Sequence, residues 1–151
     1  MKRLPPITDI INFLAINPLL ATGGMPTIDQ VQALAEAGFE VVINLALDQS
    51  PDAIPEEEVV VTRLGMRYIH IPVIWKHPQL SDLEKFFDSM QQFSSSKIFV
   101  HCVLNLRVSV FVYLYRVIVL REVSTIAHAD LLKIWQPDDI WQAFIDQTLK
   151  K

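Results

Sequence analysis

The sequence predicts an α/β domain in which helices cover both faces of a largely parallel sheet. Short β-branched apolar runs alternate along the chain with segments of helical apolar spacing, the pattern of parallel strands joined by crossover helices. With 151 residues, of which 51% are hydrophobic and 20% charged, the chain is long and apolar enough to form a core. We therefore expect one folded domain over residues 1–151.

The first helix is expected around residues 27–40 and leads into the first buried strand. Thr27 and Gln30 have the spacing of a capping box, and Gly38 suits the C-terminal end of a helix. The stretch "FEVVINLAL" that follows, residues 39–47, is short and β-branched, and the turn-forming "DQSPD" ends it.

The later elements repeat this alternation. The helix "SDLEKFFDSMQQF" has Ser81 and Glu84 at the spacing of a second capping box. In chain order we expect a strand over residues 66–74, this helix over 81–93, a buried strand over 97–100, a strongly apolar helix over 107–122, and two closing helices over 124–135 and 137–150.

The composition limits the classes of function. A formal net charge of −4 with no basic stretch gives no support to nucleic-acid binding. The most apolar run, residues 108–120, is too short to span a bilayer and contains Arg116, so no membrane partner is expected. One cysteine cannot form an internal disulfide or, alone, a thiolate zinc site. We expect no metal, no organic cofactor and a cytoplasmic location, with the periplasm as the alternative because Lys2 and Arg3 precede a broken apolar segment.

The stretch "KIFVHCVLNLRVS", residues 97–109, places the one cysteine directly after a buried strand. Ligands of parallel sheets bind beyond the carboxyl ends of the strands, which puts Cys102 at the expected site. Backbone N–H groups of the loop and the field of the following helix favour an anion and a thiolate. Arg107, in the first helical turn, can hold phosphate or sulfate oxygens with its planar guanidinium. With His101 before it and Ser109 as a hydrogen-bond donor to the thiolate, Cys102 makes a coherent nucleophile site.

Cys102 also has a purely structural interpretation. Free cysteine is among the most buried residue types, and a lone one after an apolar strand is often an inert part of the core. The position beyond the strand and the nearby arginine favour function without deciding between the two interpretations.

The quoted residues carry a resemblance to a known family. "KIFVHCVLNLRVS", preceded by "YIHIPVIWKHPQLSDLEKFFDSM", resembles the end of a cysteine-dependent dual-specificity or tyrosine phosphatase domain. "FLAINPLLATGGMPTIDQVQALAEAGFEVVINLALD" is similar to bacterial phosphatase-like proteins related to the beta-lactamase-hydrolase-like family, so the resemblance spans about residues 12–121. It implies the three-layer cysteine-phosphatase fold, a thiolate nucleophile at Cys102, an arginine that holds the phosphoryl group and an aspartate acid on a neighbouring loop. Ser109 stands where the family has a Ser or Thr.

The arginine departs from the family pattern by one position. The family has five residues between its cysteine and arginine, whereas this chain has four, and Val108 stands where the arginine is expected. One position along a helix turns a side chain by about 100°, so Arg107 serves the loop only if the helix starts differently or the side chain folds back. Asn105 replaces the loop glycine, and asparagine tolerates a left-handed conformation better than other residues with a side chain. By resemblance the phosphate-binding loop comprises Val103, Leu104, Asn105, Leu106, Arg107 and Val108.

No carboxylate stands where the family has its general acid, because "IPV" continues as "IWKH", residues 74–77. His77 is one candidate for an acid or an anion contact, and Asp48 or Asp52, in the loop after "INLAL", is another. Each also has an ordinary interpretation as a loop residue in solvent. Since an aryl phosphate has a good leaving group, we expect any phosphatase activity to be weak or confined to activated esters.

These features lead to three hypotheses. The first is a cysteine-dependent phosphatase that hydrolyses phosphate monoesters of a small molecule or a phosphoprotein through a Cys102 phosphoenzyme. The second is a pseudophosphatase that binds anions or phosphoproteins without turnover, suggested by the displaced arginine and the absent aspartate. The third is a rhodanese-like sulfurtransferase acting on another small oxyanion, suggested by the four-residue spacing, although "YIHIPV" and the apolar helix resemble phosphatases more closely.

Overall fold

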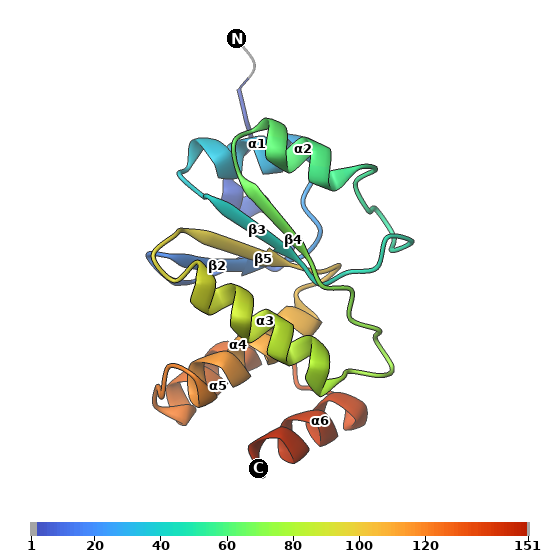
Figure 1. Cartoon of the computed structure of the whole chain (residues 1–151), viewed down its shortest axis with the longest axis vertical. Helices are drawn as coiled ribbons and strands as arrows, with labels where there is room; N and C mark the ends of the chain where they lie inside the picture. The colour runs from blue at the N-terminus through green and yellow to red at the C-terminus, as the bar shows by residue number, and fades with distance from the viewer. Residues whose placement is uncertain (1–2, 151) are drawn as a thin grey trace.

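The computed structural model describes residues 3–150, which form a central sheet with helices on both faces (Figure 1). The strands of the sheet are β1 (Leu14–Asn17), β2 (Leu20–Gly23), β3 (Val41–Asn44), β4 (Arg67–His70) and β5 (Ile98–His101). They are ordered β1-β2-β5-β3-β4, and only the edge pair β1–β2 is antiparallel. The predicted α/β fold with a mostly parallel central sheet is confirmed.

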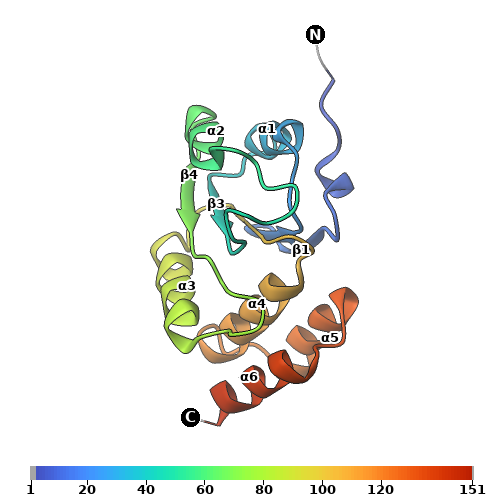
Figure 2. The same cartoon turned by 90° about the vertical axis from the view of Figure 1, so that its right-hand side faces the viewer.

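The helices divide between the two faces of the sheet (Figures 1 and 2). The first face carries the short 3-10 helix η1 (Ile7–Asp9), α1 (Ile28–Glu36) and α2 (Glu57–Arg63). The second face carries α3 (Leu80–Gln92), α4 (Leu106–Ile118), α5 (Ser124–Ile134) and α6 (Asp139–Leu149). Within residues 3–150 this makes a three-layer arrangement with six α-helices.

The parallel register aligns the strand ends at one edge of the sheet. His101 on β5 pairs with Gly23 on β2 and Asn44 on β3, and Asn44 pairs in turn with His70 on β4. The chain passes from β5 directly into Cys102 at this edge. Cys102 therefore lies beyond the carboxyl ends of the parallel strands, where α/β sheets bind their ligands.

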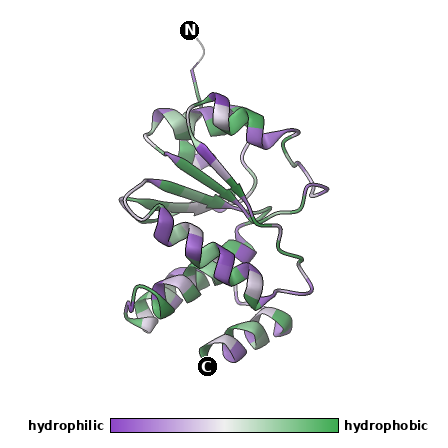
Figure 3. Ribbon diagram, viewed as in Figure 1, coloured by the Kyte–Doolittle hydropathy of each residue, from purple (hydrophilic) through white to green (hydrophobic). Residues whose placement is uncertain are grey.

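Helix α4 occupies the middle of the second layer. Every residue from Arg107 to Arg116 is buried, because α3, α5, α6 and strand β2 all contact this helix. A helix that is enclosed on all sides is hydrophobic around its whole circumference, which explains its continuous apolar sequence. In Figure 3 most of the strand ribbon is coloured as hydrophobic, whereas the outer helices alternate between hydrophobic and hydrophilic residues.

The helix α1 begins as the sequence predicts, with a complete capping box between Thr27 and Gln30. The capping box predicted for Ser81 and Glu84 is wrong. Helix α3 starts one residue earlier, after Gln79, and Ser81 lies within its first turn, where its hydroxyl donates to the Gln79 side chain at 3.4 Å. Ser81 therefore cannot act as the cap.

Two parts of the fold were not predicted. Strands β1 ("LAIN") and β2 ("LATG") have the same length as β3 and β5 but contain one β-branched residue each, and a turn at residues 18–19 separates them, so no β-branched run marks them as strands. Helix α2 contains three successive valines at 59–61, and β-branched residues disfavour a helix. Packing against β4 and α1 stabilises this helix despite its weak local preference.

Candidate functional site

A cavity of about 200 Å³ opens beside Cys102. Its wall is almost entirely apolar and includes the two residues of interest, Cys102 and Arg107. The lining residues are Trp75, Cys102, Val103, Leu104, Leu106 and Arg107. Cys102 itself is 1% exposed.

The loop after Cys102 takes a sharp turn at Asn105. This residue has φ 69° and ψ 3°, the left-handed conformation, and the helix α4 starts at the next residue. Its buried side-chain amide donates to the Asn12 carbonyl at 2.8 Å and to the Thr22 hydroxyl at 3.0 Å. Asn105 therefore takes the left-handed conformation that asparagine tolerates, and two hydrogen bonds hold it there.

Six successive backbone N–H groups follow the cysteine without an acceptor. The N–H groups of residues 103–108 donate to no atom within residues 3–150, and the first helical hydrogen bond at this end runs from Ser109 to the Asn105 carbonyl. Unpaired N–H groups at a helix start, together with the helix dipole, favour an anion.

Arg107, and not Val108, faces the cavity. Arg107 is 7% exposed and its Nη1 donates to the Val73 carbonyl at 2.8 Å, whereas Val108 is fully buried in the apolar core. No carboxylate within residues 3–150 forms an ion pair with Arg107. A guanidinium has five N–H donors, and a buried cation without a partner costs several kcal/mol. The cavity at Cys102 is thus complementary to an anion.

The start of α4 explains how the displaced arginine reaches this position. Because Asn105 makes the turn, the helix begins at Leu106 and Arg107 lies in its first turn. Compared with the pattern of five residues between cysteine and arginine, the loop is one residue shorter and Arg107 comes one residue earlier.

The N-terminal segment supports the loop from behind. Met25 N–H donates to the Val103 carbonyl at 2.9 Å, and the Asn12 side chain donates to the Leu104 carbonyl at 2.9 Å. A Cβ atom at Gly24 would lie 2.5 Å from the Val103 oxygen, so only glycine fits here. Since C=O and N–H of a trans peptide point in opposite directions, holding these carbonyls back directs the following N–H groups away from the support.

His101 forms a buried pair that the sequence did not reveal. Its Nε2 lies 2.6 Å from Glu57 Oε2, and both side chains are nearly inaccessible. Glu57 is the first residue of α2 and shares its buried side with Val61. Residues four apart lie on the same side of a helix, so if α2 had been predicted, the spacing of Glu57 to the core residue Val61 would have indicated that Glu57 is buried.

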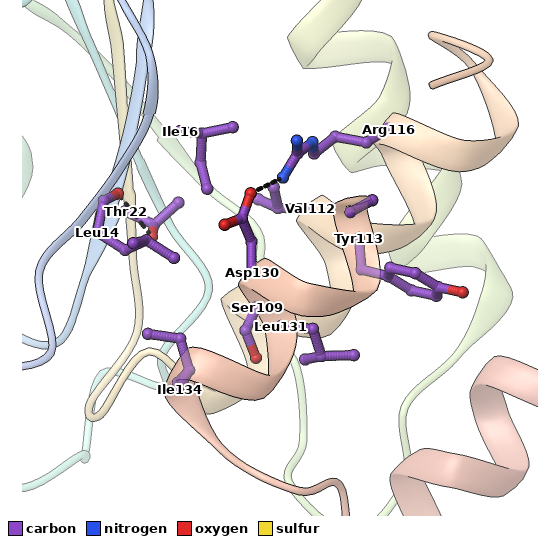
Figure 4. Close-up of a pocket in the computed structure, with 11 residues that line it drawn as sticks. Leu14, Ile16, Thr22, Ser109, Val112, Tyr113, Arg116, Asp130, Leu131 and Ile134 are labelled. Carbon is purple, nitrogen blue, oxygen red and sulfur yellow. Dashed lines mark hydrogen bonds and ion pairs between the residues drawn. The ribbon is translucent and has the colours of Figure 1, made fainter. Parts of the chain in front are cut away.

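Ser109 does not contact Cys102. Its hydroxyl donates to the Leu106 carbonyl at 2.6 Å and accepts from the Trp135 indole at 2.9 Å. It lines a separate cavity of about 10 Å³, enough for a single water, beside the Arg116–Asp130 ion pair (Figure 4). The predicted hydrogen bond from Ser109 to the thiolate is therefore absent.

None of the three candidates for the general acid lines the cavity at Cys102. Asp48 lies at a neighbouring cavity of about 360 Å³, with its carboxylate 3.8 Å from His70 Nδ1. His77 is exposed, and its backbone N–H donates to the Ile74 carbonyl. Asp52 is exposed and has φ 59°. Among residues 3–150, no carboxylate lines the Cys102 cavity.

The loop that carries Trp75 is fixed by the last helix. Trp141 is fully buried, its indole donates to the Trp75 carbonyl at 2.9 Å, and the two rings lie 5.7 Å apart. We expect Trp141→Ala to lower the free energy of unfolding by about 3–5 kcal/mol, as measured by urea denaturation. Trp141→Phe keeps a ring and loses the hydrogen bond, so it should cost about 1–2 kcal/mol. An equal loss in both variants would contradict this assignment.

The described part of the chain offers neither a metal centre nor a membrane span. Within residues 3–150, no three His, Cys, Asp or Glu side chains come together in a way that could hold a metal ion. No helix in this range combines the length and the apolar character needed to cross a bilayer.

Comparison with known proteins agrees with this geometry. The family model described as "DSP-PTPase phosphatase fused to NAD+ Kinase" matches residues 14–142. The chain belongs to this phosphatase family. No curated protein matches it.

Solved structures share the fold. A DUF442 protein from Shewanella putrefaciens CN-32, named there as a candidate phosphatase, is 34% identical, with 95% of each chain covered and a TM-score of 0.84. TpbA of P. aeruginosa, solved with phosphotyrosine, is 15% identical with a TM-score of 0.72, covering 95% of this chain and 86% of that one. PTPMT1, solved with PI(5)P, is 14% identical with a TM-score of 0.78, covering 91% and 94%. The dual-specificity phosphatase fold implied by the resemblance is thereby confirmed.

Proposed function

We propose that this protein is a phosphatase that uses Cys102 as its nucleophile and binds the phosphoryl group with the loop N–H groups and Arg107. The observation that carries the proposal is the buried Arg107, a lining residue of the cavity at Cys102 whose guanidinium forms no ion pair with a carboxylate in residues 3–150. A phosphate dianion in the cavity would supply the missing negative charge and accept from the free N–H groups.

The reaction proceeds in two displacements. The Cys102 thiolate attacks phosphorus, the S–P bond forms as the ester P–O bond breaks, and the leaving group departs as an anion that takes the electron pair of the P–O bond. A water molecule then attacks phosphorus and loses a proton to solvent, the S–P bond breaks, and hydrogen phosphate departs while the thiolate is restored. The loop N–H groups and Arg107 stabilise the equatorial oxygens, on which negative charge is spread in both steps.

The walls of the cavity limit the ester that reacts. No carboxylate is present in them to protonate a leaving alkoxide, so the ester oxygen must leave as a stable anion, as a phenolate does. Trp75, Leu104 and Leu106 offer an apolar surface to the group attached to that oxygen. The substrate is therefore an aryl phosphate or another activated monoester. Phosphotyrosine, the ligand of the TpbA structure, is a monoester of this chemical type.

Hydrolysis of p-nitrophenyl phosphate tests the proposal. We expect turnover that vanadate inhibits, and after rapid acid quench a protein mass increased by one phosphoryl group on the Cys102 peptide. Alkyl phosphates such as glycerol phosphate should be hydrolysed much more slowly, because their alkoxide leaves without an acid.

The same samples separate the other two hypotheses. A pseudophosphatase would be stabilised thermally by phosphate without releasing p-nitrophenol. A sulfurtransferase would gain the mass of one sulfur atom on Cys102 after thiosulfate treatment. Either pattern in the absence of aryl phosphate turnover contradicts the proposed phosphatase.

A further inference from the structure

The buried Glu57–His101 pair connects α2 to the loop. Glu57 is 6% exposed and His101 is fully buried. Besides its 2.6 Å contact with Glu57, the His101 ring lies with Nδ1 3.2 Å from the carbonyl oxygen of Cys102. Asn44 fixes the other carboxylate oxygen, donating to Glu57 Oε1 at 3.3 Å.

These two contacts determine the number of protons on the pair. The Cys102 carbonyl only accepts, so Nδ1 must carry a hydrogen to bond to it. A second hydrogen lies between Nε2 and Glu57 Oε2, on the ring when Glu57 is a carboxylate and on Glu57 when it is a carboxyl group. The pair therefore holds two hydrogens, as imidazolium with carboxylate or as neutral imidazole with carboxyl, whereas a neutral imidazole facing a carboxylate leaves one lone pair against the Cys102 carbonyl or against Glu57.

The pair acts on the loop in two ways. In the form with a carboxylate, the imidazolium would place positive charge one residue before the nucleophile, which favours a thiolate there. It also holds the Cys102 carbonyl toward the interior. Since C=O and the next N–H of a trans peptide point in opposite directions, the Val103 N–H is directed away from His101 and toward the cavity side.

We propose that Glu57 is a positioning residue for the reaction, keeping His101 protonated and oriented so that the thiolate form of Cys102 and the first N–H donor of the loop are preset. The inference rests on the proposed function for its role in turnover. Its effect on the thiol is independent of whether any substrate is hydrolysed.

The surroundings of Glu57 leave His101 as its ionic partner. Tyr68 on β4 bonds to Asn44, and burial, with the negative charge of Glu57, raises the pKa of this phenol, so it stays neutral. The other titratable groups at the neighbouring cavity are Asp48, Glu56, Glu58 and His70. Asp48 is directed to His70, and Glu56 and Glu58 are exposed on the helix start, so none of them replaces Glu57 at His101.

The test measures the thiolate directly. Cys102 is the one cysteine of the chain, so subtracting the ultraviolet absorbance of a Cys102→Ser protein isolates the thiolate signal as a function of pH. In Glu57→Gln, which keeps the size of the side chain but cannot balance an imidazolium, we expect the titration to move to higher pH and the thiolate population on its acidic side to fall about tenfold. The acidic limb of the pH profile of kcat/KM should move with it, while activity at high pH approaches that of the wild type.

Two comparisons keep the inference falsifiable. Glu58→Gln removes an adjacent but exposed carboxylate and should leave the titration unchanged. In a His101→Asn background, Glu57→Gln should have no further effect on the titration, because Glu57 acts through the imidazole. Where Glu57→Gln alone folds poorly, His101→Asn must itself show the shift to higher pH. The proposal is overturned if the thiolate titration of Glu57→Gln or of His101→Asn superimposes on that of the wild type. It is also overturned if Glu58→Gln shifts the titration by the same amount. If the titration shifts as expected but the wild type hydrolyses no aryl phosphate, only the proposed phosphatase activity is overturned.

Discussion

Cys102→Ser is expected to abolish aryl phosphate hydrolysis, with kcat/KM reduced by roughly a thousandfold or more. Serine keeps the size of the side chain, but its hydroxyl is not ionised at neutral pH, so the attacking group is lost while the loop is retained. Cys102 is 1% exposed and packs in the apolar core, so burying the serine hydroxyl should lower the free energy of unfolding, by about 1 kcal/mol because the shape of the side chain is retained. Steady-state kinetics with p-nitrophenyl phosphate and urea denaturation measure the two effects.

The serine variant should still bind the anion. Phosphate or vanadate is expected to raise its melting temperature as in the wild type, because the N–H groups of residues 103–108 and Arg107 are unchanged. Equal turnover in both proteins would show that Cys102 is not the nucleophile.

Arg107→Met is expected to reduce kcat/KM by about 10²–10³-fold without making the protein less stable. The substitution removes the positive charge that faces the cavity and keeps an unbranched side chain of similar length. Losing the hydrogen bond to the Val73 carbonyl costs about 1.5–3 kcal/mol, and relieving an unpaired buried charge returns an amount of the same order. A substitution that abolishes activity by unfolding the protein would lower the free energy of unfolding together with kcat/KM, unlike the result expected for Arg107→Met.

Phosphate-dependent stability distinguishes this role most directly. In wild type, phosphate at about 100 times its Kd should raise the free energy of unfolding by about 2.7 kcal/mol, and in Arg107→Met this increase should nearly vanish. Arg63→Met, which changes an exposed arginine on α2, serves as the matched control and should respond as the wild type does. If Arg107→Met retains the full phosphate response, Arg107 is not an anion ligand.

Much of the fold could be predicted because its strands and long helices have strong local signals. The buried strands β3 and β5, the capped helix α1 and the apolar helix α4 all follow from β-branched runs, a capping box and continuous burial. The hairpin of β1 and β2 and the helix α2 escaped prediction because they depend on tertiary contacts. The local sequences of β1 and β2 lack a β-branched run, and that of α2 contains residues that disfavour a helix.

The site was predictable in its position and only partly in its contacts. The placement of Cys102 follows from strand order, and the left-handed Asn105 follows from the tolerance of asparagine for that conformation. Whether Arg107 or Val108 faces the loop depends on where the helix starts, which no local pattern determines to within one residue. Glu57 and the Val73 carbonyl are brought to the loop from distant parts of the chain, so no spacing near Cys102 indicates them.

The support of the loop by Asn12 and Met25 has a consequence for how the molecule acquires its site. Asn12 and Leu104 are 92 positions apart, and Asn12 and Asn105 are 93 apart, yet their hydrogen bonds set the shape of the turn. Contacts of such long sequence separation form late, after the intervening chain has lost most of its conformational freedom. A folding intermediate with β5 and α4 already in place would thus have Cys102 and Arg107 but would lack the shape of the loop that we propose binds the anion. Competence to bind phosphate should appear only with the final docking of the first strands, which makes phosphate binding a reporter of complete folding.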